Sequence, residues 1–70
     1  MEIFAQRLKA LRLERKRTLR EMADYLEVGM RAYQYYEDGS RHPDYQSLVA
    51  LADYFQVTTD YLLGRTEERT

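Results

Sequence analysis

The sequence predicts an all-α domain built from five short helices, and three observations support this fold class. Apolar residues recur at helical spacing in successive segments, and capping residues or glycines separate these segments. No segment shows the alternation of apolar and polar residues that indicates a strand. The chain has 70 residues with one proline and three glycines, which fits one folded domain and argues against a disordered chain.

The first two helices are predicted from residue spacing and from one capping signal. Phe4, Leu8 and Leu11 stand at positions i, i+4 and i+7, so residues 3 to about 15 should form an amphipathic helix. Thr18 followed by Glu21 matches a capping box, in which each side chain accepts a hydrogen bond from the backbone N–H of the other residue. A second helix should therefore begin after Thr18 and end at the turn 27–29.

A glycine and a proline set the limits of the third helix. We expect this helix from Met30 to Glu37, because Asp38-Gly39 follows and glycine readily adopts the left-handed conformation that ends a helix. Pro43 disfavours helical geometry in the residue before it, so the segment 41–44 is predicted to be a loop.

Two further helices are predicted in the second half of the chain. A helix from about Tyr45 to Gln56 is indicated by four apolar residues at helical spacing, Leu48, Leu51, Ala52 and Phe55. Thr58 is a suitable N-cap for a short fifth helix that ends before Gly64. We assign residues 1–66 to one domain and expect residues 67–70 to form a frayed C-terminal tail.

The composition excludes several classes of function. The chain has no cysteine and a single histidine, His42, which excludes disulfides, thiolate zinc sites and hydrolytic triads. Its three glycines stand far apart and form no phosphate-binding loop. We therefore expect no enzymatic activity, metal, cofactor or small-molecule ligand. The longest apolar stretch, Leu48 to Ala52, is far below the roughly 20 residues of a membrane span, and no export signal is present, so we expect a cytoplasmic protein.

The net charge of −1 conceals an uneven distribution of charge along the chain. Residues 7–20 carry seven basic residues and one acidic residue, a net charge of +6, whereas residues 42–70 carry a net charge of −3. A basic segment is usually only a solvated helix face. Binding to nucleic acid therefore needs support from other residues.

Residues 18–37 have the length and order of a helix, a tight turn and a second helix, and short motifs surround them in a specific joint spacing. The motifs are Arg7-Leu8-Lys9 with Leu11-Arg12, Thr18 with Glu21-Met22-Ala23, Val28, Tyr36-Glu37-Asp38-Gly39, Arg41 with Pro43, Leu51-Ala52-Asp53-Tyr54-Phe55 with Val57, and Asp60-Tyr61-Leu62-Leu63-Gly64. Over about residues 4–65 the chain resembles the helix-turn-helix DNA-binding proteins of the phage repressor and Cro type, the XRE family. The resemblance implies a five-helix repressor-like domain with a central helix-turn-helix.

The resemblance implies a regulator that binds double-stranded DNA sequence-specifically, with the third helix in the major groove. Base reading is implied for four residues of this helix, Met30, Arg31, Gln34 and Tyr35. Arg31 can pair with guanine and Gln34 with adenine, while Met30 or Tyr35 can touch a thymine methyl group or the sugar backbone. The alternative for each of these positions is ordinary solvated surface.

Contacts to the DNA backbone are implied for five residues at the rim of this unit, Thr18, Leu19, Arg20, Ser40 and Arg41. Leu19 departs from the family, whose members commonly have glutamine there, because leucine can offer a phosphate only its backbone N–H. Asp38 replaces an asparagine and would bring a negative charge to the DNA. Gly29 replaces the usual serine cap.

Three structural roles also follow from the resemblance. Arg12 should pair with Glu37 and hold the reading helix to the core. Glu27 stands where the family usually has glycine, because the turn needs a positive φ angle. Dimer contacts are implied for the apolar residues of the fifth helix, Tyr61, Leu62 and Leu63, whose alternative is burial in the monomer core.

Other functions stay open on this sequence. Seven tyrosines could stack on single-stranded nucleic acid, but four of them occupy core positions of the helical pattern, Tyr33, Tyr36, Tyr54 and Tyr61. The same fold also serves antitoxin-type regulators. A protein-interaction module is favoured by Leu19, Glu27 and Asp38. It is opposed by Arg31, Gln34 and the basic segment. We expect a bacterial or phage-encoded repressor that binds a palindromic operator as a homodimer.

Overall fold

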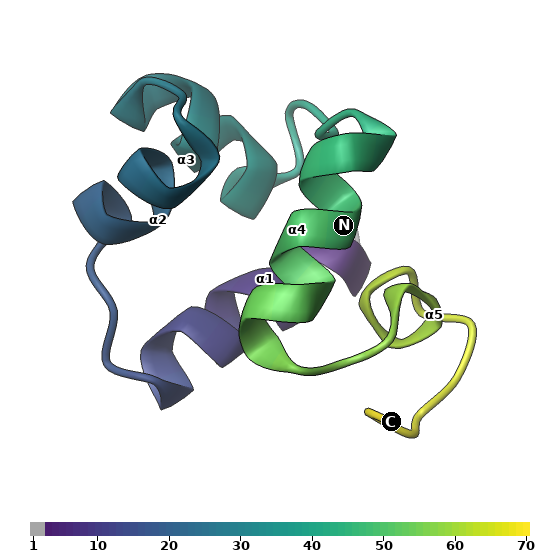
Figure 1. Ribbon diagram of the computed structural model, residues 1–70. Helices are drawn as coiled ribbons and strands as arrows, with labels where there is room; N and C mark the ends of the chain where they lie inside the picture. Colours follow the sequence, from purple (N-terminus) through teal and green to yellow (C-terminus); the bar gives the residue numbers. More distant parts are fainter. Residues whose placement is uncertain (1–2) are drawn as a thin grey trace.

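The computed structural model describes residues 3–70, and its helices match the predicted order (Figure 1). They are α1 (Ile3–Glu14), α2 (Leu19–Leu26), α3 (Met30–Asp38), α4 (Tyr45–Phe55) and α5 (Thr59–Leu62). No strand occurs within the described residues, so the all-α fold class is confirmed. None of the helices in this part of the chain is long and apolar enough to cross a membrane.

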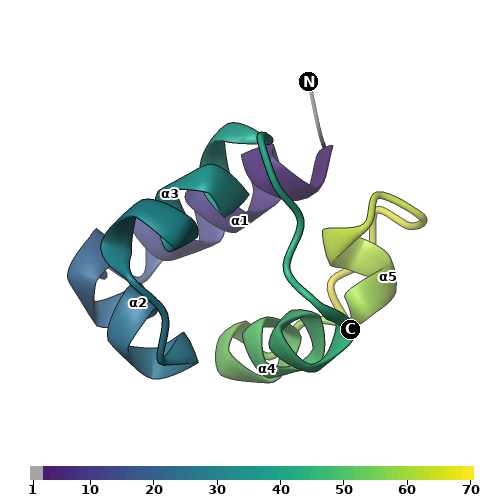
Figure 2. The same ribbon diagram turned by 90° about the horizontal axis from the view of Figure 1, so that it is seen from above.

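The helices form two groups that α1 connects. Helix α2 packs against α3, and α4 packs against α5, while α1 contacts both α3 and α5. Seen from above, α2 and α3 lie on one side of the molecule and α4 and α5 on the opposite side (Figure 2). The helix-turn-helix of α2 and α3 therefore forms one side of the domain.

One apolar core joins these elements. Its buried side chains come from the five helices and from the second residue after α4; they are Phe4, Leu8, Leu11, Met22, Ala23, Tyr33, Leu51, Ala52, Phe55, Val57 and Leu62. In a domain this small, nearly all of the large apolar side chains are needed for the core. The spacing that predicts the first, second and fourth helices therefore also identifies the faces that are buried.

The predicted capping signals are formed. The Thr18 hydroxyl accepts a hydrogen bond from the Glu21 N–H at 3.0 Å, and the Glu21 carboxylate accepts one from the Thr18 N–H at 2.8 Å. The Thr58 hydroxyl accepts from the Tyr61 N–H at 2.9 Å at the start of α5. The structure adds a cap for α4, in which the Asp44 carboxylate accepts from the Ser47 N–H at 2.8 Å.

Among residues 3–70, three residues other than glycine adopt left-handed backbone angles: Lys16 (φ 58°), Glu27 (φ 59°) and Gln56 (φ 57°). The positive φ of Glu27 confirms the expectation for the turn between α2 and α3. Lys16 and Gln56 were not expected there, because no glycine or family pattern marks their positions. Each side chain at such an angle costs on the order of 1 kcal/mol relative to glycine.

The C-terminal tail of residues 67–70 contacts α1 and the start of α5. The Arg69 guanidinium donates two hydrogen bonds of 2.9 Å to the Glu14 carboxylate, and the Arg69 carbonyl accepts from the Thr58 N–H at 2.8 Å. The Glu67 carboxylate accepts a hydrogen bond from Arg7 at 3.1 Å. These contacts hold the tail against the domain and oppose fraying. The expected fraying of residues 67–70 stays a prediction.

Candidate nucleic-acid interface

The turn between α2 and α3 exposes one face of α3. Glu27 ends α2 in the left-handed conformation, and its N–H donates to carbonyls of the last turn of α2. Gly29 is extended and begins α3. Tyr33 is fully buried beneath α3, so the opposite face of this helix points away from the core.

The four expected base-reading residues differ in exposure. Arg31 and Gln34 are exposed and stand three residues apart, so they share the outer face of α3. Met30 is half-buried and packs against the core. Tyr35 is also half-buried. The structure therefore brings Arg31 and Gln34 together on the surface and leaves less of Met30 and Tyr35 for contact with a ligand.

The start of α2 carries three of the expected backbone-contact residues. Arg20 is exposed, and Leu19 is half-buried against the core. The Thr18 oxygen is engaged in the capping box, but its O–H can still donate to an acceptor outside the protein. The first N–H groups of a helix attract anions, so this end of α2 suits a phosphate even without a polar side chain at Leu19.

Asp38 and Ser40 interact with each other after α3. The Ser40 N–H donates to the Asp38 carboxylate at 2.8 Å. Hydrogen bonds from the Ser40 side chain and backbone lower the pKa of Asp38 below its usual value. Asp38 is therefore ionised at neutral pH and brings a negative charge close to Gln34, as its departure from the family pattern suggested.

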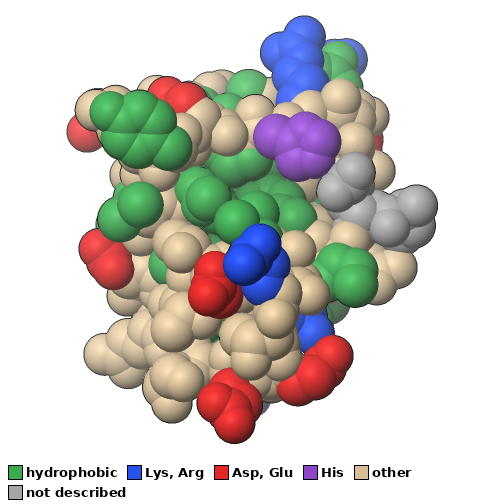
Figure 3. Space-filling model, turned by 90° about the vertical axis from the view of Figure 1, so that its right-hand side faces the viewer, with side chains coloured by type: hydrophobic (Ala, Val, Ile, Leu, Met, Phe, Trp, Pro, Cys, Tyr) green, Lys and Arg blue, Asp and Glu red, His purple; other side chains and the backbone are tan. Residues whose placement is uncertain are grey.

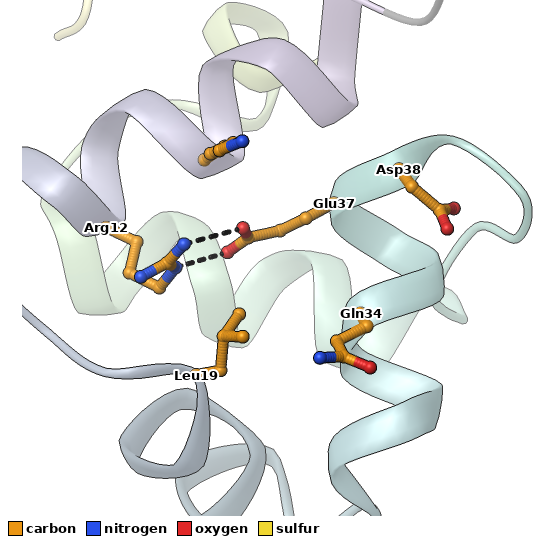
Figure 4. A pocket seen from close by; sticks show the side chains of 6 residues that line it. Arg12, Leu19, Gln34, Glu37 and Asp38 are labelled. Carbon is orange, nitrogen blue, oxygen red and sulfur yellow. Dashed lines mark hydrogen bonds and ion pairs between the residues drawn. The ribbon is translucent and has the colours of Figure 1, made fainter.

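Arg12 and Glu37 form the ion pair that the resemblance implies (Figure 4). Arg12 donates from Nε to Glu37 Oε2 at 2.7 Å and from Nη2 to Oε1 at 3.1 Å, and a third donor reaches the Arg17 carbonyl at 3.0 Å. The hydrogen bond to Glu37 raises the pKa of Arg12. The pair fixes the last turn of α3 to α1.

An open groove lies beside this pair, between α1, the start of α2 and α3. Its lining residues are Lys9, Arg12, Leu19, Gln34, Glu37 and Asp38. Leu19 and Gln34 point into the groove from α2 and α3 (Figure 4). Sequence reasoning did not select Lys9 as a site residue, although it lies three residues before Arg12 and therefore on the same side of α1.

Several basic residues of the segment 7–20 serve structural contacts. Arg7 donates to the carbonyls of Tyr61 and Thr66, and Arg15 donates to the Phe55 carbonyl at 3.2 Å. Arg12 is engaged with Glu37. The exposed remainder of the segment includes Lys9, Lys16, Arg17 and Arg20. The basic charge that can face a ligand is thus smaller than the sequence count of +6 suggests.

The expected dimer residues occupy three different environments. Leu62 is fully buried in the monomer core, so its assignment to a dimer surface is wrong. Helix α5 has a single turn, and Leu62 is the residue of that turn that faces inward. Tyr61 is half-buried, with the Arg7 and Arg69 guanidinium carbons 4.1 and 5.5 Å from its ring centroid. Leu63 is 48% exposed.

Apolar side chains gather at the centre of the molecular face that carries α4 and α5, with charged side chains around them (Figure 3). On α4, Tyr45 is 77% exposed and Val49 is 46% exposed, and their i, i+4 spacing places them on one side of the helix. These two exposed apolar side chains were not predicted from the sequence, because the spacing of apolar residues in this segment indicates only its core positions. In the described residues, no group of three or more potential ligand residues is placed to bind a metal.

Comparison with known proteins identifies relatives over nearly the whole chain. The family described as helix-turn-helix matches residues 8–62. The uncharacterized HTH-type transcriptional regulator YqaE of Bacillus subtilis strain 168 is 41% identical over 68 residues, which are 96% of this chain and 59% of that protein. The HTH-type transcriptional regulator ImmR of the same strain is 39% identical over 64 residues, with 91% and 50% covered.

Similarity extends to a phage protein and to a solved structure. The cryptic phage CTXphi transcriptional repressor RstR of Vibrio cholerae is 33% identical over 60 residues, which are 86% of this chain and 54% of RstR. The crystal structure of a transcriptional regulator from Listeria innocua matches with a TM-score of 0.86 and 35% identity, over 93% of this chain and 61% of that one. The chain thus spans about half to three-fifths of the length of these relatives.

Proposed function

The chain belongs to the helix-turn-helix family, and on this premise we propose that it is a sequence-specific regulator of transcription that binds double-stranded DNA. The observation that carries the proposal is the exposed pair Arg31 and Gln34 on a helix that the Arg12–Glu37 ion pair holds to the core. The major groove is about 12 Å wide and admits one helix with such side chains on its outer face. The protein would act in the cytoplasm, on bacterial or phage DNA.

The roles of the interface residues divide into reading and positioning. Arg31 can donate two hydrogen bonds to guanine, and Gln34 can exchange two with adenine. Arg20, Ser40 and Arg41 are exposed around α3 and suit contacts to phosphates, which orient the protein without reading sequence. The Leu19 N–H at the start of α2 is a further phosphate donor, and the Lys9 ammonium group in the adjacent groove can approach the same strand.

We further propose that two copies bind a palindromic operator. One short helix covers only a few base pairs, whereas specific regulators typically bind with dissociation constants of about 10⁻⁸ M or tighter. A twofold dimer would place its two reading helices about 34 Å apart, one turn of DNA. Leu63 and the neighbouring part of Tyr61 provide an exposed apolar contact outside the reading surface.

Repression is the mode of regulation that we propose, and it is supported by the similarity to RstR, which is named as a transcriptional repressor. A regulator that blocks promoter access needs only specific binding, and the chain offers the surface for that.

A protein-interaction module is the second candidate, and two observations favour it. Leu19 presents no polar side chain at the start of α2, and Asp38 places a negative charge near the reading face.

Two measurements separate these functions. The first is fluorescence anisotropy with a random duplex between about 50 and 200 mM salt, where a DNA-binding protein loses affinity steeply because it releases counterions from phosphates. The second is selection of bound duplexes from a random pool, which yields the half-site and its symmetry. The matched variants are Arg31→Ala with Gln34→Ala, and Arg65→Ala, which removes an exposed arginine after α5.

We expect an enriched palindrome whose binding is lost in the double variant and kept in Arg65→Ala. Absence of salt-dependent binding to any duplex would contradict the DNA-binding function and favour the interaction module. An enriched site without twofold symmetry would contradict the dimer but not the regulator.

A further inference from the structure

Tyr35 and Arg41 are in contact through both backbone and side chains. The Arg41 N–H donates to the Tyr35 carbonyl at 3.3 Å. The Arg41 guanidinium carbon lies 4.6 Å from the centroid of the Tyr35 ring, within the range of a cation–π interaction. A residue of the reading helix and a residue of the following loop therefore form one unit, which we call the Tyr35–Arg41 stack.

The chain after α3 is shaped to bring these residues together. Gly39 ends α3 with a φ of 86°, an angle that glycine adopts without strain. The hydrogen bond from the Ser40 N–H to Asp38 then holds the turn. Together they reverse the chain direction, so that Arg41 returns to the level of Tyr35 instead of continuing away from the helix.

The stack leaves the donor groups of Arg41 available. Stacking on an aromatic face uses the plane of the guanidinium, whereas its N–H groups lie at the edge of that plane. Within the described part of the chain, the Arg41 guanidinium makes no hydrogen bond or ion pair, and the residue is exposed. It is therefore a cation that is already oriented but whose donors have no partner among residues 3–70.

The stack also limits what Tyr35 can do. The ring is half-buried, and the Arg41 guanidinium covers part of the remaining surface. A thymine methyl group would need an open ring face, and Arg41 competes for it. The geometry thus opposes the role in base reading that the resemblance implies for Tyr35.

We propose that Tyr35 is a positioning residue that holds the Arg41 guanidinium ready for a DNA phosphate, and that it does not itself read bases. This inference rests on the proposed DNA-binding function. An arginine side chain that is held before binding loses less rotamer freedom on contact with the phosphate than a free one, so the stack increases affinity. The increase is the same for every DNA sequence, because a phosphate carries no sequence information.

A double-mutant cycle tests the inference. Kd is measured by anisotropy for a selected operator and for a random duplex, with wild type, Tyr35→Leu, Arg41→Ala and the double variant, and thermal melts verify that each variant is folded. Tyr35→Phe keeps the ring and removes only the hydroxyl group, so it is the conservative control. Arg65→Ala controls for the loss of one positive charge elsewhere on the surface.

We expect Tyr35→Leu to weaken binding by about 2- to 5-fold, the range of an exposed cation–π contact, and by the same factor on both duplexes. In the Arg41→Ala background the same substitution should have no further effect, because the residue that it positions is gone. Tyr35→Phe should bind like wild type. Arg41→Ala should also reduce the slope of log Kd against log salt by about 1.

Three results would overturn the inference. Equal effects of Tyr35→Leu in both backgrounds would show that the two residues act independently. A change of preference at one base pair in Tyr35→Leu would make Tyr35 a base reader. Wild type that binds neither duplex would remove the proposed function itself, whereas the first two results leave that function intact and reject only the stack.

Discussion

The Glu37 carboxylate at the end of α3 receives two hydrogen bonds from the Arg12 guanidinium of α1, and the two side chains are only 7% and 10% exposed. The residues are 25 positions apart in the chain, and their contact joins α3 to α1, the longest of the described helices. A charged pair with so little exposed surface is costly to break from one side, because the remaining charge keeps its burial and loses its partner.

Removal of either partner should therefore destabilise the fold strongly. We expect Arg12→Met and Glu37→Gln each to lower the free energy of unfolding by about 3 to 5 kcal/mol, compared with at most about 1 kcal/mol for an exposed pair. The exposed pair of Arg65 and Asp60, 3.4 Å apart, is the matched control through Arg65→Ala. Thermal and urea melts provide the measurement. Losses under 1 kcal/mol in both core variants would refute a stabilising role for the ion pair.

Glu27→Gly should stabilise the protein. The native φ of 59° disfavours glutamate, and glycine relieves that strain while it adds some entropy to the unfolded chain. The net gain in unfolding free energy should be modest, below about 1 kcal/mol. Gln56→Gly, at a φ of 57° after α4, should behave alike because its backbone has nearly the same angle. A drop in Tm for both variants would contradict this account of strain.

Arg31→Ala and Arg20→Ala should have different effects on DNA binding: the first should change base preference, and the second should change affinity for all sequences. Loss of a bidentate contact to guanine should relax the preference at one operator position by about 1 to 3 kcal/mol. Loss of a phosphate contact at Arg20 should weaken all sequences nearly equally and flatten the dependence on salt. Competition titrations with single-base operator variants make the comparison. A uniform loss across the operator series for Arg31→Ala would move this residue to the group of backbone contacts.

Leu63→Glu should weaken dimer formation without destabilising the folded monomer. Leu63 is 48% exposed, so a charge there should leave the monomer stable but weaken a dimer that buries this residue. Leu62→Ala should instead cost about 2 to 5 kcal/mol of stability, because Leu62 is fully buried in the core. Sedimentation of the protein with an operator duplex reports the stoichiometry. A two-to-one complex that Leu63→Glu leaves unchanged would place the dimer contact elsewhere.

The tail should be released at low pH. The hydrogen bonds from Arg69 lower the pKa of Glu14, so the contact is present above the usual glutamate value of about 4.3 and is lost as the pH falls through the lowered value. Glu14→Gln should release the tail at neutral pH as well. Hydrogen exchange of the Thr58 amide, which donates to the Arg69 carbonyl, follows the release directly. Unprotected exchange of this amide in wild type at neutral pH would instead support the frayed tail that the sequence predicts.

Local signals made most of the fold predictable from the sequence. Thr18 and Thr58 cap helices through hydrogen bonds that span three residues, so the pattern contains both partners. The Arg12–Glu37 contact spans 25 residues and was accessible only through the resemblance to a family. The left-handed angles of Lys16 and Gln56 had no such marker, because neither residue type favours that geometry.

The candidate site was less predictable, because consecutive residues of a helix point about 100° apart and the sequence does not show which of two apolar neighbours faces the core. A single-turn α5 buries Leu62 and exposes Leu63, and apolar character cannot distinguish the two. The Tyr35–Arg41 stack depends on the path of the chain after Gly39, and the residues alone do not specify that path. Arg7 and Arg15 contribute to the net charge of +6 of residues 7–20. Both side chains, however, donate hydrogen bonds to backbone carbonyls of distant segments, so they are less available to a ligand.

Helix α1 contacts α3 through Arg12 and the α5 segment through Arg7, five residues earlier. Twelve residues of α-helix form a stiff rod about 18 Å long. If two copies associate through Leu63, this rod sets the distance and the angle between their reading surfaces. Because the rod is stiff, neither the distance nor the angle can change much. One base pair inserted at the operator centre moves the half-sites apart by about 3.4 Å and rotates them by about 35°. The dimer would therefore bind tightly only to operators with one fixed spacing between the half-sites.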